Sequence, residues 1–223
     1  ALDPAQKRRV VEITVDQVAG RVPVYVGASA ITTREAVEHA QLAESLGAQA
    51  LSVLTPFYIS PTENEMYDHY VAVAKSTKLP IVLYTNPDRT GGNNISANLC
   101  ERLADIDNIV AIKDAKGDFS EVSRVLNQTD LMYFSGDDAN ALPHMAIGAT
   151  GLIGVTANIT AAPYRVMVDA VNRGDLATAT AAHQSLEPLV RAVMTTPRPQ
   201  PRRNRAAFPS GKAHEKTRRP TTQ

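Results

Sequence analysis

Short apolar runs that return at regular intervals are the feature that most limits the fold of this chain. Each run has five or six residues, and successive runs begin 28, 30, 29, 22 and 20 residues apart. Runs that are apolar on both faces are typical of buried strands in a parallel sheet. We therefore predict six strands, at residues 22–27, 50–54, 80–84, 109–113, 131–135 and 151–155.

The segments between these runs carry the start and stop signals of helices. Asp3 and Pro4 open the first expected helix, and Gly20 and Gly47 are placed to end the first two. Pairs with the spacing of a capping box occur at Thr32 and Glu35, at Thr62 and Glu65, and at Asp118 and Glu121. Strands that alternate with helices, without a hairpin signal between them, predict an α/β fold around a parallel sheet.

Two architectures fit this alternation, an open doubly wound sheet and a (β/α)8 TIM barrel. An open sheet usually has a glycine-rich phosphate loop after its first strand, whereas here the sequence ASAITT follows. That difference favours the barrel. Because six strands are predicted instead of eight and the chain opens on a helix, we expect the first two strands to be missing from it. We also expect a C-terminal helix after the barrel.

The net charge of zero hides an uneven distribution along the chain. Residues 197–223 contain eight Lys or Arg, a single Glu, five prolines and no Val, Ile, Leu or Met. Such a segment cannot bury enough apolar surface to offset the entropy of ordering it. We predict a folded domain over residues 1–196 and a basic, disordered tail over residues 197–223. A solvated tail is favoured over an arm that binds nucleic acid.

Composition also argues against several other classes of protein. No apolar run approaches the roughly 20 residues that span a bilayer, and no N-terminal signal pattern is present, so no membrane partner is expected. The single cysteine, Cys100, lies in an apolar helical pattern, which predicts a buried thiol and a cytoplasmic location. The five histidines lack the spacing of metal ligands, so no metal is expected.

Reactive side chains gather where the predicted strands end. Tyr84 ends one strand and Lys113 ends the next, and neighbouring parallel strands lie about 4.8 Å apart. Tyr58 follows an earlier strand, and Arg89 lies in the loop between Tyr84 and Lys113. In barrels the chemistry takes place at this rim. Asn86 and Pro87 are interpreted as a turn.

This set of residue types predicts carbonyl chemistry. A desolvated lysine is a nucleophile toward a keto acid, a tyrosine hydroxyl relays protons, and an arginine binds a carboxylate. The residues thus indicate a class I aldolase or lyase. The alternative is that Lys113 extends to solvent or pairs with Asp114. Lys116, which follows in a loop with Gly117, is expected to be solvated.

Four segments resemble one known family. The segments TPFYISP, YTNPDRTGG, VAIKDAKGD and FSGDDANALPHMAIGATGLIGVTANI are similar, in order and spacing, to the dihydrodipicolinate synthase / N-acetylneuraminate lyase family. The resemblance covers residues 2–196. It implies a (β/α)8 barrel that binds pyruvate as a covalent imine and needs no separate cofactor.

The resemblance also implies a role for individual residues. Lys113 would form the Schiff base, Tyr84 would relay protons, and Tyr58 would be lent across a subunit interface to the neighbouring site. Backbone groups of Gly136 and Ile153 would line the pyruvate pocket. The implied partners are therefore small-molecule substrates and further copies of the chain, in a homodimer or homotetramer.

Arg89 favours one branch of the family. In PDRTG it matches the arginine that binds the carboxylate of L-aspartate 4-semialdehyde. The implied reaction is the condensation of pyruvate with that aldehyde, a step of lysine biosynthesis. Two alternatives stay open: a 2-keto-3-deoxy-sugar-acid or other pyruvate-dependent aldolase, and an inactive barrel fragment whose sheet edges are left open.

Overall fold

The computed structural model describes residues 2–195, which divide after Gly154 into two compact units. The first unit, residues 2–154, alternates strands and helices, and the second, residues 155–195, consists of two helices. The predicted basic tail, residues 197–223, lies outside the described residues.

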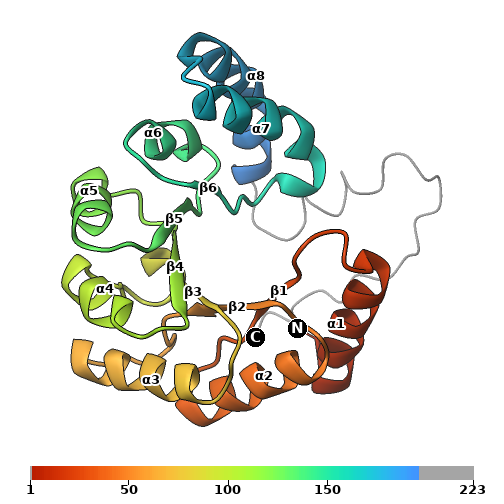
Figure 1. Cartoon of the computed structure of the whole chain (residues 1–223), viewed down its shortest axis with the longest axis vertical. Helices are drawn as coiled ribbons and strands as arrows, with labels where there is room; N and C mark the ends of the chain where they lie inside the picture. Colours follow the sequence, from red (N-terminus) through yellow and green to blue (C-terminus); the bar gives the residue numbers. More distant parts are fainter. Residues whose placement is uncertain (1, 196–223) are drawn as a thin grey trace, which may run out of the picture. The chain divides into compact units, whose positions relative to one another are not determined.

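All six predicted strands form, and they make one parallel sheet in chain order (Figure 1). Their bounds are Tyr25–Gly27 (β1), Ala50–Leu54 (β2), Ile81–Thr85 (β3), Ile109–Asp114 (β4), Met132–Ser135 (β5) and Gly151–Leu152 (β6). Each strand pairs with the one that follows it, whereas a doubly wound sheet reverses its strand order. The sheet therefore has the topology of a barrel wall.

In the first unit, helices alternate with the strands and lie on the outer side of the curved sheet in Figure 1. The second unit has two helices where a single C-terminal helix was predicted, and they pack against each other. The helices of the first unit are Pro4–Val18 (α1), Thr33–Ser45 (α2), Glu63–Lys75 (α3), Ala97–Ala104 (α4), Phe119–Gln128 (α5) and Ala141–Ala146 (α6), with a short 3-10 helix at Pro87–Arg89. Those of the second unit are Ala157–Asn172 (α7) and Leu176–Met194 (α8).

The two outermost strands are shorter than predicted, while the four inner strands agree to within one residue at each end. β1 begins at Tyr25 instead of residue 22, and β6 ends at Leu152 instead of residue 155. An outermost strand has one neighbour to pair with, so less of its backbone is held in the sheet. Pro23 also lacks the N–H that a strand residue donates.

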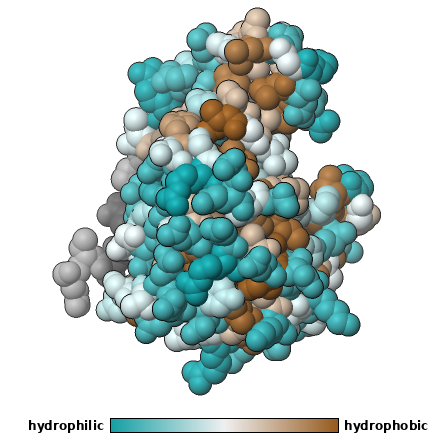
Figure 2. Space-filling model, turned by 60° about the vertical axis from the view of Figure 1, so that its left-hand side comes forward, coloured by the Kyte–Doolittle hydropathy of each residue, from teal (hydrophilic) through white to brown (hydrophobic). Residues whose placement is uncertain are grey.

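The core of the first unit lies between the sheet and its helices. Leu83 and Ile112, which are paired across β3 and β4, are almost fully buried there. Cys100 on α4 is buried as predicted, and burial raises the pKa of its thiol. On the face shown in Figure 2, hydrophilic and neutral side chains are widespread and hydrophobic ones form smaller patches.

All four predicted helix starts are correct. Thr62 and Glu65 form a complete capping box, in which the Thr62 hydroxyl accepts from the Glu65 N–H and the Glu65 carboxylate accepts from the Thr62 N–H. Asp118 caps α5 by accepting from the Ser120 and Glu121 N–H groups. The Glu121 carboxylate does not complete that box, because it binds other donors at the end of the sheet.

Replacing Thr62 with alanine is expected to lower the free energy of unfolding by about 1 kcal/mol, because the Glu65 N–H loses its acceptor at the start of α3. Urea unfolding followed by far-UV circular dichroism measures the change. Thr62→Ser keeps the hydroxyl and should behave like the original chain. Equal stability of Thr62→Ala and Thr62→Ser would contradict the role of the cap.

Candidate active site

Lys113 and Tyr84 meet at the rim, as the sequence predicts. The two residues are paired neighbours on β4 and β3, near the carboxyl ends of both strands. The Lys113 Nζ lies 4.3 Å from the centroid of the Tyr84 ring, within the range at which a ring face attracts an ammonium group. Both residues are half-buried. The arrangement places an amine against a phenol in a partly shielded position.

Asp114, the residue after Lys113, lies on the opposite face of β4. It is buried, and its carboxylate accepts hydrogen bonds from the Tyr133 hydroxyl and from the backbone N–H of Lys116. Successive residues of a strand point to opposite faces. The geometry therefore favours Lys113 beside Tyr84 over the alternative in which Lys113 pairs with Asp114.

The Tyr84 hydroxyl has a partner that the sequence reading missed. The Asn86 side-chain amide donates to the Tyr84 Oη at 3.0 Å. Asn86 was interpreted only as part of a turn, and the 3-10 helix does begin at the next residue, Pro87. The sequence offers one signal for this contact. Side chains two positions apart in an extended chain point to the same side, so Asn86 lies on the side of Tyr84.

Tyr58 extends away from the rest of the first unit. Its backbone has a φ of 72°, a region that residues other than glycine seldom adopt, and its side chain is 93% exposed. The loop that carries it is tied to the next loop by Asn93, whose amide donates to the Pro56 and Ile59 carbonyl oxygens at 2.7 Å each. These hydrogen bonds therefore hold the loop in the conformation that leaves Tyr58 exposed.

Arg89 lies on the same side of the sheet, at the end of the short helix that follows β3, and it is exposed. Its backbone N–H donates to the Asn86 carbonyl at 2.9 Å, which fixes the position of the loop. Of the four reactive residues predicted for this rim, the structure brings Lys113 and Tyr84 into contact, while the side chains of Arg89 and Tyr58 are exposed.

Gly136 and Ile153 follow the last two strands and lie against their neighbours through the backbone. The Gly136 N–H donates to the Asp114 carbonyl at 2.6 Å, and the Ile153 N–H donates to the Ser135 carbonyl at 2.8 Å. A Cβ on Gly136 would lie 2.9 Å from the Asp114 carbonyl oxygen, which is too close for any larger residue. Both N–H groups are therefore engaged within the sheet, with Gly136 buried and Ile153 half-buried.

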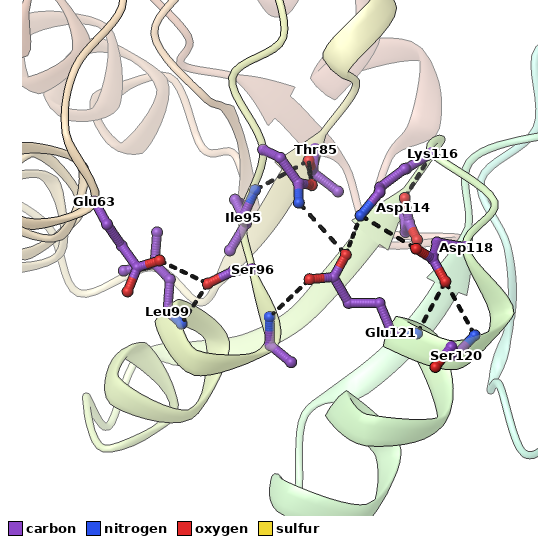
Figure 3. Close-up of polar contacts among 12 residues, drawn as sticks. Glu63, Thr85, Ile95, Ser96, Leu99, Asp114, Lys116, Asp118, Ser120 and Glu121 are labelled. Atoms are coloured by element: carbon purple, nitrogen blue, oxygen red, sulfur yellow. Dashed lines mark hydrogen bonds and ion pairs between the residues drawn. The ribbon is translucent and has the colours of Figure 1, made fainter.

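A network of polar contacts supports the rim from the helix side (Figure 3). Its centre is Glu121 on α5, whose carboxylate accepts from the Lys116 ammonium, from the Ala97 N–H at 3.2 Å and from the Asn94 amide at 3.4 Å. Asn94 in turn accepts from the Thr85 hydroxyl at 3.0 Å. One carboxylate thus joins the loop after β3 to the loop after β4.

Lys116 is exposed, as predicted, and it also forms ion pairs with Glu121 and Asp118. Desolvation disfavours its charge, but the hydrogen bond and the charge of Glu121 outweigh that effect and raise the pKa of the lysine. The role of Glu121 in this network was not predicted from the sequence, because its spacing from Asp118 indicates a capping box.

Two further features concern ligands and membranes. Within residues 2–195, no three His, Cys, Asp or Glu side chains gather as a metal site requires. No helix in that range is long and apolar enough to span a membrane.

Comparison with known proteins identifies the family of the chain. The model of the dihydrodipicolinate synthetase family matches residues 1–223. The 4-hydroxy-tetrahydrodipicolinate synthase of Nitratidesulfovibrio vulgaris (strain DP4) is 38% identical over 198 residues, which are 88% of this chain and 68% of the relative. The enzyme of the same name from Acidothermus cellulolyticus is 43% identical over 184 residues, 82% of this chain and 59% of the relative.

Solved structures show the same relationship. A crystal structure of a dihydrodipicolinate synthase superimposes with a TM-score of 0.90 at 36% identity, covering 96% of this chain and 75% of the other. The synthase of Aquifex aeolicus superimposes with a TM-score of 0.87 at 31% identity, covering 90% and 69%. The chain spans about three fifths to two thirds of the length of the two relatives compared by sequence. It belongs to the dihydrodipicolinate synthetase family.

Proposed function

We propose that this protein condenses pyruvate with L-aspartate 4-semialdehyde, as a class I lyase of lysine biosynthesis that acts in the cytoplasm. The observation that carries the proposal is the contact between Lys113 and Tyr84, in register at the carboxyl ends of adjacent strands. The curated relatives named above bear the name 4-hydroxy-tetrahydrodipicolinate synthase, which describes the same reaction.

In the proposed mechanism, Lys113 supplies the nucleophile. Its neutral amine attacks the ketone carbon of pyruvate, and the two amine protons leave with the ketone oxygen as water, so that an imine remains. Loss of a proton from the pyruvate methyl group gives an enamine, whose carbon attacks the aldehyde. The amino group of the semialdehyde then displaces Lys113 and closes the product ring. Because the imine itself activates pyruvate, no further cofactor is needed.

Tyr84 is the proposed proton relay for these steps. The Lys113 amine lies 4.3 Å from the centroid of the Tyr84 ring, so the phenol and the amine share one part of the rim. General acid–base groups must lie within reach of the atoms they serve. Backbone groups of Gly136 and Ile153, which follow the last two strands, are proposed to line the pyruvate pocket.

Arg89 and Tyr58 are proposed to act at the mouth of the site. An exposed guanidinium on the loop after β3 is suited to bind the carboxylate of the incoming semialdehyde bidentately. A tyrosine that is 93% exposed on a constrained backbone is suited to enter the site of a neighbouring copy. We therefore propose a homo-oligomer, at least a dimer, as the active form.

The six strands are proposed to belong to an eight-stranded barrel. In the described sheet, β1 and β6 each pair with one strand, so both outer edges are open. Beside β1 lies a groove of about 500 Å³ whose apolar lining includes Val24, Val26 and Leu42. An apolar groove along an open strand edge is the environment that a further strand requires.

Treatment of the full chain with pyruvate and sodium borohydride is expected to reduce the imine and attach one pyruvate-derived group to Lys113, as read by intact mass and peptide mapping. Lys113→Ala should remain unlabelled while retaining its circular dichroism spectrum. Lys75→Ala, which replaces an exposed lysine on α3, should be labelled like the original chain. A folded chain without an adduct would refute the mechanism and favour an inactive fragment, whereas an adduct on another lysine would refute the role of Lys113.

Arg89→Ala is expected to raise the KM for L-aspartate 4-semialdehyde about ten- to a hundredfold, because hydrogen bonds to a charged group contribute roughly 1.5–3 kcal/mol. The measurement is steady-state kinetics with each substrate varied in turn, and the KM for pyruvate should change little. Arg124→Ala, on the exposed face of α5, is the matched control. Imine formation without consumption of the semialdehyde would instead indicate a 2-keto-3-deoxy-sugar-acid aldolase.

A further inference from the structure

Asn86 is held in place by more contacts than a simple turn requires. Its carbonyl oxygen accepts hydrogen bonds from the Arg89 N–H at 2.9 Å and from the Thr90 hydroxyl at 3.0 Å. The following Pro87 confines it to an extended backbone, and its φ of −154° agrees. Its side chain does not cap the short helix that begins there. The fixed backbone therefore sets the direction of the Asn86 side-chain amide, which hydrogen-bonds the Tyr84 hydroxyl.

The hydrogen bond from Asn86 determines what the Tyr84 hydroxyl can do. The amide N–H occupies one lone pair of the Tyr84 oxygen at 3.0 Å, so the hydroxyl proton must point in another direction. The Lys113 amine lies over the same ring, 4.3 Å from its centroid. A fixed donor at the oxygen also offsets the negative charge that develops there when the proton is given away.

We propose that Asn86 is a positioning residue for the reaction of Lys113 with pyruvate, acting through the Tyr84 hydroxyl. The inference rests on the proposed function and adds a residue to it. When the Lys113 nitrogen bonds to the ketone carbon, Tyr84 gives its proton to the ketone oxygen and a carbinolamine forms. Tyr84 then takes one proton from the lysine nitrogen and passes it to the hydroxyl, so that the C–O bond breaks and water leaves. Tyr84 finally takes the second proton of the lysine nitrogen, which leaves the neutral imine and restores the Tyr84 hydroxyl. The Asn86 amide stabilises the Tyr84 oxygen while that oxygen is deprotonated.

The test measures the rate of imine formation on the full chain, by mixing it with pyruvate, quenching with borohydride at intervals and measuring the adduct by mass. Asn86→Leu removes the donor at similar volume, and Asn86→Asp keeps the shape but offers an acceptor. Each is expected to slow the rate at saturating pyruvate about tenfold, the effect of losing one hydrogen bond to a developing charge. The pyruvate concentration that gives half the maximal rate should stay the same.

A double-mutant cycle separates this role from a structural one. In the Tyr84→Phe background, the hydroxyl is absent, so Asn86→Leu is expected to cause no further slowing. Asn98→Leu, which replaces an exposed asparagine on α4, is the matched control and should react like the original chain. Circular dichroism melting checks that every variant is folded.

Three results would overturn the inference. If both Asn86 variants form the imine as fast as the original chain, the role of Asn86 is refuted and the proposed function is unaffected. Equal slowing by Asn86→Leu with and without the Tyr84 hydroxyl shows that Asn86 does not act through Tyr84. Absence of any adduct in the folded original chain refutes the proposed function itself, and the inference that rests on it.

Discussion

The parallel pairing of β3 with β4 is the constraint on which the candidate site depends. Interstrand hydrogen bonds hold the two backbones about 4.8 Å apart, and the register places Tyr84 opposite Lys113. A shift of one residue would turn one of these side chains toward the helices. The buried pair Leu83 and Ile112 on the opposite face opposes such a shift. Apolar packing behind the sheet therefore holds the reactive groups in place.

Because successive residues of a strand point to opposite faces, the two polar residues of β4, Lys113 and Asp114, lie in different surroundings. Lys113 lies beside Tyr84 at the rim, whereas Asp114 is buried on the face toward the helices. A buried carboxylate is costly unless its oxygens are paired, and both Asp114 oxygens accept hydrogen bonds. Burial and the charge of Asp114 raise the pKa of Tyr133, so that hydroxyl keeps the proton it donates. The end of the strand that carries Lys113 is thereby anchored.

The fold and the central pair of the site were predictable because their signals are local. An apolar run and its flanking cap residues identify each strand and helix, and position at the end of a run identified Tyr84 and Lys113. The support network was not predictable, because its partners are distant in sequence: Glu121 binds the backbone of Ala97, 24 residues away. Lys116 is exposed as predicted, but its ion pairs with Asp118 and Glu121 were not predicted, because the directions of these side chains depend on how the loop after β4 meets α5.

The sequence by itself determined which segments become strands and helices, the order in which they alternate, and which reactive residues end the strands. These follow from propensities and apolar patterns that act over a few neighbouring residues. Only the tertiary structure decided that Asn93 ties the loop of Tyr58 to the next loop, that Glu121 joins two rim loops, and that Asn86 gives its amide to Tyr84. The first two depend on distances and directions between segments, which are set when the strands pair and the helices pack against them. The third depends on the turn after β3, whose backbone directs the Asn86 amide toward Tyr84.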